Sequence, residues 1–500
     1  MMANLKKWLE KNKLELFGLV VLLLVASIFR FYNLDKLSFF TYDQARDALY
    51  IKRIIVDHKL RLIGTQTSIP GLYTGPAYYY LMAPFLWIFR LNPIGIDVAT
   101  ALFGILTVGL LYWLVKIFGR NRHLALLVAL VYAAQPQVVN QSRFAWNPNT
   151  MPFFTLLFIW GLFLVRKKHI LGWLMTFFSL AILLQLHYSA VCFLPVLLIF
   201  VIFYRKQVKF DHWFLSGLLL FFVLMSSLVF FDLRHQFTNI KAILTYLKRG
   251  APGEIPPPPF YPGLFEKLRL LLVEIVFGVK DKLISLGVIL LIFFLSALSY
   301  LKQKDFRDGI FLTLSCLVFG VLVASFYRGS FFEFYLTFLY PIGFLLIGIL
   351  ASFLFNRSHW WKAGIVLLFL IIFLFNLRKI DIFTEPKRTI NDLKLASGVI
   401  AEDIKNGQAF NLVGVLGEGR FDYNAVDYRY FLETYYGKKA LDWDVLDYQN
   451  AKILYLTSEV GKINPLEAGI WEVNLFGPKE IIKTWELPKD VVIYKLGKEK

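Results

Sequence analysis

Two carboxylates lie four residues apart in the segment FTYDQARDALYIKR, Asp43 and Asp47, directly after the first long apolar run of the chain. In a helix both would lie on one face, where two like charges destabilise the helix unless another group uses them. A carboxylate at the edge of an apolar environment is partly desolvated, which raises its pKa toward the range of a general base. Two other interpretations stay open: Asp43 could cap the helix, or the pair could hold a divalent metal ion.

Charged side chains interrupt the apolar pattern at three later points. Arg143 lies in SRFAWNPNTMP, Arg234 lies in FFDLRHQF, and Glu333 follows Arg328 in YRGSFFEF. The planar guanidinium of arginine matches the oxygens of a phosphate group, so Arg143, Arg234 and Arg46 are candidate phosphate ligands. Simpler roles stay open as well. Arg46 could screen the acids beside it, Arg234 could bind lipid headgroups, and Glu333 could pair with Arg328.

Neutral hydrogen-bonding side chains lie near the same points. Asn147 and Asn149 flank a proline, so Asn147 could cap the helix that follows. Gln185, His187 and Tyr188 lie together in LLQLHYSA at the end of an apolar run. A lone histidine at such a place is more often structural than catalytic, while its two neighbours form an edge suited to sugar hydroxyls. All five are candidate substrate contacts.

The elements that must position these side chains are membrane helices. The 500 residues are 57% hydrophobic and only 18% charged, and the mean hydropathy is +0.58. One soluble core cannot hold so many apolar side chains, and runs such as LISLGVILLIFFLSALSYL are long enough to cross the bilayer as helices. The first run has no cleavage site after it, so we expect a retained anchor. Cys192 and Cys316 both lie in apolar segments and indicate neither a disulfide framework nor a metal motif.

The distribution of basic residues predicts the topology. The net charge of +19 gathers in short clusters at the ends of apolar runs rather than in one patch, which argues against nucleic acid as a partner. If all these basic clusters lie on the cytoplasmic side, the chain crosses the cell membrane about eleven times. Its N-terminus then lies inside the cell and its C-terminus outside. The expected spans are 14–32, 94–118, 124–139, 150–165, 170–187, 188–204, 212–231, 283–301, 309–326, 335–355 and 362–377. The apolar stretch 76–91 is then a juxtamembrane or re-entrant segment; a true span there would invert the middle of the protein.

The chain divides into two predicted domains. Residues 1–384 form a helical membrane domain with two long external loops, 33–93 and 232–282. After 385 the apolar runs shorten to strand length, as in AFNLVGVLG, AKILYLTSE, IWEVNLF, IIKTWEL and VVIYKLG, with helices expected at 389–405 and 425–436. Residues 385–500 are therefore expected to form a small extracytoplasmic α/β domain. Every candidate residue lies on the outer side in this topology, where a cavity is expected.

The order of these motifs resembles the GT-C membrane glycosyltransferases, and within them the family 39 group of protein O-mannosyltransferases and aminoarabinose transferases. The segments that carry the resemblance, over residues 14–350, are FTYDQARDAL, GPAYYYLMAPFLWIF, SRFAWNPNTMPFF, LQLHYSAVCFLP and FDLRH. The family's first-loop motif is an Asp-Glu pair whose aspartate acts as base, which implies that role for Asp43. Gln44 replaces the glutamate. Tyr79 lies in the family's proline-aromatic element, but no basic residue precedes Pro76. Arg143 matches a recurring arginine.

The resemblance implies an inverting glycosyltransferase that moves a sugar from a polyprenyl-phosphate carrier to an acceptor hydroxyl at the outer membrane face. The implied partners are this donor, membrane lipid and an acceptor glycan, lipid or protein, and no cofactor is expected. Asp47, Tyr79 and Glu333 join the neutral residues above as expected sugar or acceptor contacts. Three alternatives stay open. One is a polyprenyl-linked glycan polymerase or ligase, and another is a lipid flippase or transporter, although no internal repeat typical of transporters is seen. The third is a non-catalytic scaffold whose C-terminal domain binds a partner.

Overall fold

The computed structural model describes residues 2–250, 260–355, 357–386, 388–405, 407–416 and 424–498, without the side chains of residues 2–11. The chain forms two compact units. The membrane unit comprises Met1–Tyr32, Leu60–Met82 and Asp97–Ile382, and the sheet unit comprises Asn33–Lys59, Ala83–Ile96 and Phe383–Lys500. The segment 33–93, predicted to be the first external loop, therefore contributes to both units, and its early part belongs with the C-terminal residues.

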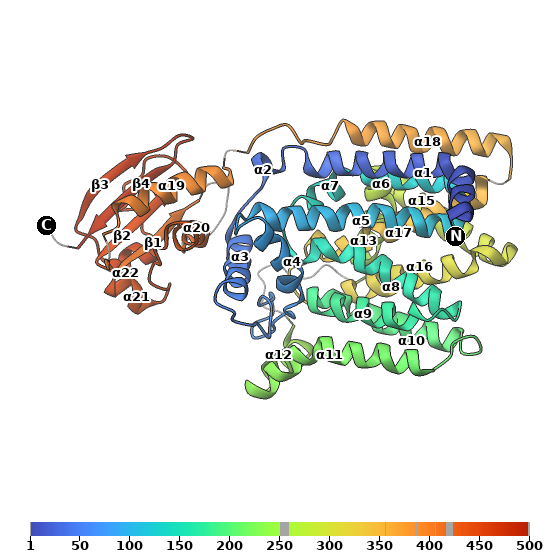
Figure 1. Ribbon diagram of the computed structural model, residues 1–500, viewed down its shortest axis with the longest axis horizontal. Coiled ribbons are helices and arrows are strands. Elements are labelled where there is room, and N and C mark those ends of the chain that lie inside the picture. The colour runs from blue at the N-terminus through green and yellow to red at the C-terminus, as the bar shows by residue number, and fades with distance from the viewer. Residues whose placement is uncertain are drawn as a thin grey trace. The chain divides into compact units, whose positions relative to one another are not determined.

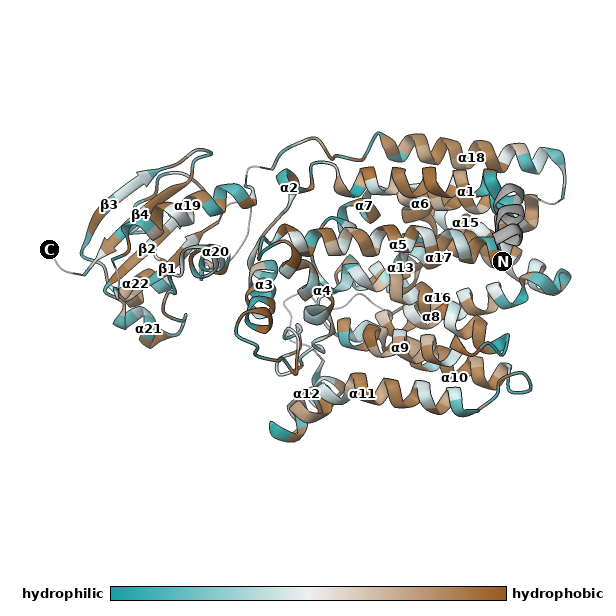
Figure 2. Ribbon diagram, in the orientation of Figure 1, coloured by the Kyte–Doolittle hydropathy of each residue, from teal (hydrophilic) through white to brown (hydrophobic). Residues whose placement is uncertain are grey.

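Long apolar helices make up the membrane unit (Figures 1 and 2). Within the described residues, eight helices are long and apolar enough to cross a membrane. They are α1 (Met2–Phe31), α5 (Ile94–Gly119), η1 with α8 (Asn147–Arg166), α11 (His212–Arg234), α15 (Lys282–Lys302), η4 with α16 (Lys304–Ser325), η5 with α17 (Glu333–Phe355) and α18 (His359–Leu377). The polytopic helical fold is confirmed, while the number of eleven spans stays a prediction.

The remaining predicted spans are also helical but shorter or bent. They are α6 (Arg122–Ala133) with α7 (Pro136–Ser142), α9 (Leu171–Leu186), and η2 (Tyr188–Cys192) with α10 (Phe193–Phe203). The first pair bends by 67° at its break. Helix α4 (Ala77–Ile88) covers the stretch that we expected not to span. Its 12 residues rise only about 18 Å, which is less than the hydrocarbon thickness of a bilayer.

Close packing joins the helices of this unit. Every residue of α17 from Tyr340 to Phe353 is buried, so α17 is a central helix. Helices α8 and α9 approach closely because Gly161 has no side chain: a Cβ there would lie 2.7 Å from the backbone nitrogen of Thr176. Such contacts are typical of helix pairs in membranes, where small residues allow backbones to meet.

The segment 232–282, predicted to be the second external loop, is largely helical in its described residues. It contains α12 (Thr238–Arg249), α13 (Phe260–Arg269), the π-helical turn η3 (Leu270–Glu274) and α14 (Ile275–Phe277). The proline run 256–259 lies outside the described residues. Helix α12 is amphipathic, since Ile240, Leu244 and Leu247 are exposed on one stripe while Lys241 and Arg249 follow another.

The sheet unit contains a four-stranded mixed sheet in the order β1-β2-β4-β3. Its strands are β1 (Phe410–Val415), β2 (Ile453–Ser458), β3 (Glu480–Glu486) and β4 (Val492–Gly497). Strands β1 and β2 are parallel, and the other two pairs are antiparallel. The C-terminal part of the unit also contains helices α19 (Ile390–Asp403), α20 (Val426–Tyr436), α21 (Val445–Asn450) and α22 (Trp471–Phe476). The expected C-terminal α/β domain is confirmed, whereas its boundary at 384 stays a prediction.

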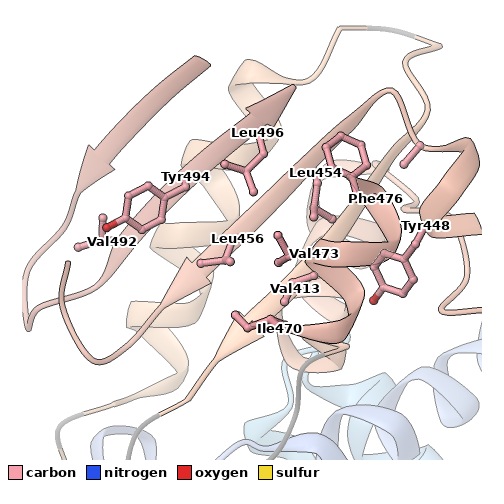
Figure 3. Packing of buried hydrophobic residues seen from close by; sticks show 11 residues of the cluster. Val413, Tyr448, Leu454, Leu456, Ile470, Val473, Phe476, Val492, Tyr494 and Leu496 are labelled. Atoms are coloured by element: carbon pink, nitrogen blue, oxygen red, sulfur yellow. The ribbon is translucent and has the colours of Figure 1, made fainter. Parts of the chain in front are cut away.

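Alternation along the strands builds two faces of the sheet. Leu454 and Leu456 of β2 face a core shared with α21 and α22 (Figure 3). Tyr455, which lies between them in the strand, donates a hydrogen bond to Asp403 of α19. The residues of that core are Val413, Tyr448, Ala451, Leu454, Leu456, Ile470, Val473, Phe476, Val492, Tyr494 and Leu496. The prediction of a strand at IWEVNLF was wrong. Ile470, Val473 and Phe476 are buried at helical spacing, and the chain leaves α22 through Gly477 at a φ of 67°.

Helix α3 (Tyr42–Ile55), which carries the paired acids, packs against α20 of the sheet unit. Lys52 pairs with Glu433 at 2.8 Å. The ring of Phe40, just before α3, contacts the ring of Tyr430 with centroids 5.4 Å apart. The C-terminal residues thus fix the orientation of α3.

Candidate active site

The start of α3 is closed by a capping box. Thr41 is the N-cap residue, and the Oε1 atom of Gln44 accepts hydrogen bonds from the Thr41 backbone nitrogen at 3.2 Å and hydroxyl at 2.6 Å. Asp43 follows the cap and lies in the first turn, so its interpretation as the N-cap was wrong. The side-chain oxygen of Gln44 is therefore occupied by hydrogen bonds at the start of the helix.

Arg46 lies between the two acids and binds both. Its Nη1 atom is 2.8 Å from Oδ1 of Asp43, and its Nη2 atom is 2.9 Å from Oδ1 of Asp47. The arginine compensates the like charges that the four-residue spacing brings together. The acids differ in access: the side chain of Asp43 is 39% exposed, whereas that of Asp47 is 3% exposed. Asp43 is therefore the carboxylate that a substrate can reach.

The two acids of α3 were also candidate ligands of a divalent metal ion. Across the described parts of the chain, no group of three or more His, Cys, Asp and Glu side chains is placed to hold a metal ion. A hard divalent cation usually takes six or more oxygen ligands, and here a guanidinium occupies the space between Asp43 and Asp47.

Arg388 joins the residues before α3 to the C-terminal domain, and sequence reasoning missed it. Its Nη1 atom donates to the carbonyl oxygen of Phe40 at 2.5 Å, its Nε atom pairs with Glu459 at 2.5 Å, and its Nη2 atom pairs with Asp427. All three charged side chains are under one tenth exposed. Residues 348 positions apart in the chain meet here, so no local signal could have indicated the contact.

Arg143 binds the end of the first membrane helix. Its Nη1 atom donates to the carbonyl oxygens of Phe29, Arg30 and Tyr32, at 3.1, 3.1 and 2.9 Å. The last carbonyls of a helix have no intrahelical partner, and an arginine is well suited to bind them. The buried Nη2 atom of Arg143 has no hydrogen-bond partner among the described residues. The Nη1 atom of Arg143 is therefore used in structural hydrogen bonds, whereas its Nη2 atom could still bind another group.

The asparagines and Gln185 bind backbone groups of neighbouring segments. Asn147 donates to the carbonyl of Leu186 at 2.5 Å, and Asn149 donates to that of Phe144 at 2.9 Å. Gln185 donates to the carbonyl of Leu224 at 3.1 Å. These buried side chains fix the turn 140–149 and the end of α9.

The residues after Gln185 continue this network. The carbonyl of Gln185 accepts from Gly75 at 2.9 Å, where a Cβ on the glycine would lie 2.3 Å from the Gln185 side chain. Tyr188 donates to the carbonyl of Tyr73 at 2.7 Å. His187 bonds to Ser189 through Nδ1 at 2.9 Å and lies against the ring of Tyr335. The structure thus brings the first loop, the end of α9 and the segment before α17 together.

Three other predicted residues have different surroundings. Tyr79 is fully buried in α4. Arg234, in the last turn of α11, and Glu333, at the start of η5, are exposed, and neither forms an ion pair within the described residues. The pairing of Glu333 with Arg328 is not seen. Tyr79 can therefore affect only the packing around the site, whereas Arg234 and Glu333 are accessible to a ligand.

Sequence reasoning missed three buried charges in the membrane unit. Arg30 is fully buried and donates to the carbonyls of Ala26 and Ala133. Asp97 accepts a hydrogen bond from the backbone of Ala145 at 3.0 Å, and Lys267 lies 4.4 Å from the ring centre of Phe331. Charges beside or inside apolar runs are costly and so are informative, and this signal was present in the sequence.

Part of the chain matches a family model. Residues 73–231 match the family described as dolichyl-phosphate-mannose-protein mannosyltransferase. This region contains the proline-aromatic element, the turn with Arg143 and the end of α9. A sequence search found no match among curated proteins.

Solved structures share the fold over nearly the whole chain. ArnT from Cupriavidus metallidurans, bound to undecaprenyl phosphate, is 11% identical, with a TM-score of 0.64 over 97% of this chain and 98% of that one. Its apo form gives a TM-score of 0.60 at 11% identity, over 95% and 97% of the two chains. The Archaeoglobus fulgidus oligosaccharyltransferase, also apo, is 13% identical, with a TM-score of 0.54 over 87% of this chain and 65% of that one. The fold that the resemblance implied is therefore confirmed.

Proposed function

We propose that the chain is a membrane glycosyltransferase of the GT-C class, which transfers a sugar from a polyprenyl-phosphate carrier to an acceptor hydroxyl at the outer membrane face. Support for the carrier comes from the fold shared with ArnT, which was solved with undecaprenyl phosphate. A lipid phosphate is a sufficient leaving group once cations meet its charge, so the reaction requires no nucleotide.

Asp43 is the proposed general base. The observation that carries this assignment is the difference in access between the two acids of α3, because Asp43 is 39% exposed and Asp47 is 3% exposed. Asp43 would remove the proton of the acceptor hydroxyl as its oxygen attacks the anomeric carbon. The bond from that carbon to the phosphate breaks in the same displacement, so the configuration inverts. Arg46 holds the base in position.

Two arginines are proposed to meet the phosphate. Arg143 has a buried nitrogen without a hydrogen-bond partner among the described residues, and Arg234 is exposed at the end of α11. A guanidinium can bind two phosphate oxygens at once, and this interaction strengthens as charge develops on the leaving group. Arg46 is already paired with both acids, so its proposed contact with the donor requires it to share its nitrogens.

The test is Asp43→Asn in the purified full chain, assayed with a radiolabelled polyprenyl-phosphate sugar. A general base contributes about 10²–10⁴ in rate, so we expect a loss of that size with unchanged thermal unfolding. Asp57→Asn is the matched control, since Asp57 is exposed just after α3. A normal transfer rate in the Asp43→Asn variant would exclude Asp43 as the base.

We propose a cytoplasmic N-terminus and an extracytoplasmic C-terminal domain, on the basis of the basic clusters. Both native cysteines are buried, so an added cysteine can be labelled against a low background. Asn474→Cys, on α22, should react with a membrane-impermeant maleimide in intact cells. Lys206→Cys, in a basic cluster, should react only after the cells are opened. The reverse pattern would overturn this orientation.

A further inference from the structure

A pocket of about 300 Å³ lies within the sheet unit, where α3 meets the segment before α21. We propose that it binds one sugar ring of the acceptor, a role that rests on the function proposed above. The residues that line it are Arg46, Leu49, Tyr50, Arg53, Asp442, Trp443 and Asp444. None of the C-terminal members was a candidate from the sequence.

The charges of the pocket balance. Its two arginines and two aspartates give +2 and −2, so the lining carries no net formal charge. Within the described residues, neither Arg53 nor Asp442 forms an ion pair, which leaves one strong donor and one strong acceptor for a ligand. A sugar hydroxyl both donates and accepts hydrogen bonds, so it can bind both groups at once. An anion would be repelled by the aspartates and a cation by the arginines.

Aromatic rings provide the apolar surface of the pocket. Tyr50 and Trp443 line the pocket together with Leu49, and Trp443 is 41% exposed. The less polar face of a sugar ring packs well on an indole, which offers a large surface at a small entropic cost. A volume of about 300 Å³ lies at the lower end of the range for ligand pockets, which suits one ring rather than a lipid chain.

The indole is held by a rigid support. The guanidinium of Arg429 lies 5.6 Å from the ring centre of Trp443. Arg429 also donates to the carbonyl of Asn424 at 2.6 Å, to the carbonyl of Leu441 at 2.5 Å, and to the side chain of Asn411 in β1. These bonds fix the backbone on which Trp443 is carried. An exposed tryptophan held in this way is preorganised for a ligand.

Arg46 connects the pocket to the proposed base. It lines the pocket and also binds Asp43 at 2.8 Å. A sugar ring in the pocket would therefore contact the same arginine as the carboxylate that takes the proton, and its position would affect which hydroxyl of a larger acceptor reaches Asp43. The pocket would act on acceptor choice rather than on the donor.

The test measures sugar binding directly, without catalysis. Saturation-transfer NMR on the full chain in nanodiscs would use the methyl glycosides of mannose, glucose, galactose and N-acetylglucosamine, with mannitol as an open-chain polyol. We expect saturable binding of at least one glycoside and none of mannitol. Trp443→Ala should weaken binding about five- to tenfold through the lost ring contact, and Asp442→Asn about tenfold through the lost charged acceptor.

Trp471→Ala is the matched control, because Trp471 is an exposed tryptophan on α22 outside the pocket. The inference is overturned if no glycoside binds, if the Trp443→Ala and Trp471→Ala variants bind equally well, or if inorganic phosphate binds in place of the sugars. Transfer by the wild-type chain, measured in parallel, separates the two proposals. Transfer without sugar binding overturns only the pocket, whereas sugar binding without transfer overturns the proposed function and leaves the sugar site standing.

Discussion

The polar residues of the membrane unit and those of α3 in the sheet unit use similar groups in different ways. In the membrane unit, the side chains of Asn147, Gln185 and Tyr188 donate hydrogen bonds to backbone carbonyls of neighbouring segments. In α3 the charged groups bind one another, and the carboxylate of Asp43 stays accessible. The difference teaches that a polar side chain at the predicted site can act either on the shape of the site or on the reaction. The role of such a side chain depends on whether its polar atoms are accessible to a substrate or are bonded to the backbone.

The largest effect on structure is expected from the anchor of α3. Arg388→Gln removes the partner of two buried carboxylates, Asp427 and Glu459, and leaves both charges uncompensated. Breaking a buried ion pair in this way costs about 3–5 kcal/mol. We expect a lower unfolding temperature and a loss of transfer because α3 is no longer fixed. Thermal unfolding in detergent measures the first effect, and the transfer assay measures the second.

The exposed arginine after α18 provides the control for that experiment. Arg378→Gln changes the same residue type at a position without an ion pair in the described chain, and it should leave both readouts near wild type. If the two variants unfold at the same temperature, the anchoring role of Arg388 is wrong.

A smaller effect is expected in the membrane unit. Asn147→Ala leaves the buried carbonyl of Leu186 without its donor, at a cost of about 1–3 kcal/mol. If the network only positions loops, the unfolding temperature should fall while transfer at a permissive temperature falls less than in Asp43→Asn. Asn450→Ala, at an exposed helix end, is the control. Loss of transfer with unchanged stability would instead give Asn147 a direct role and break the comparison between the two regions.

The smallest effect is a pH dependence of the sheet unit. Burial by itself raises the pKa of Asp403, but the contacts with Lys495 at 2.6 Å and Tyr455 at 2.7 Å lower it below the usual value. A lowered folded pKa stabilises the fold above the unfolded value of about 4, and this contribution disappears as the pH falls through the folded pKa. Asp403→Asn should cost under about 1 kcal/mol at pH 7, and the difference should close in acid. Thermal unfolding across pH measures it, and a constant difference would contradict the assignment.

Sequence reasoning succeeded where the signal is local. Apolar run length predicted helices in all eleven expected spans, and shortened runs predicted the C-terminal domain. It failed where a helical spacing of apolar residues was taken for a strand. Ile470, Val473 and Phe476 lie three residues apart, so a strand cannot bury all of them on one face. It also failed for contacts between distant residues. Asp43 and Arg46 could be found from their spacing, but Arg388 and Trp443 became candidates only when folding had placed them beside α3.

The bond from Arg388 to Phe40 has a consequence for the order in which the protein matures. The two residues are 348 positions apart, so at about 5–20 residues per second the ribosome makes Phe40 roughly 17–70 s before Arg388. During that time the helix with the proposed base has no anchor. A nascent chain can thus have all its membrane helices formed and still be inactive. The protein would become active only when the C-terminal domain folds against α3, a segment synthesised near the beginning.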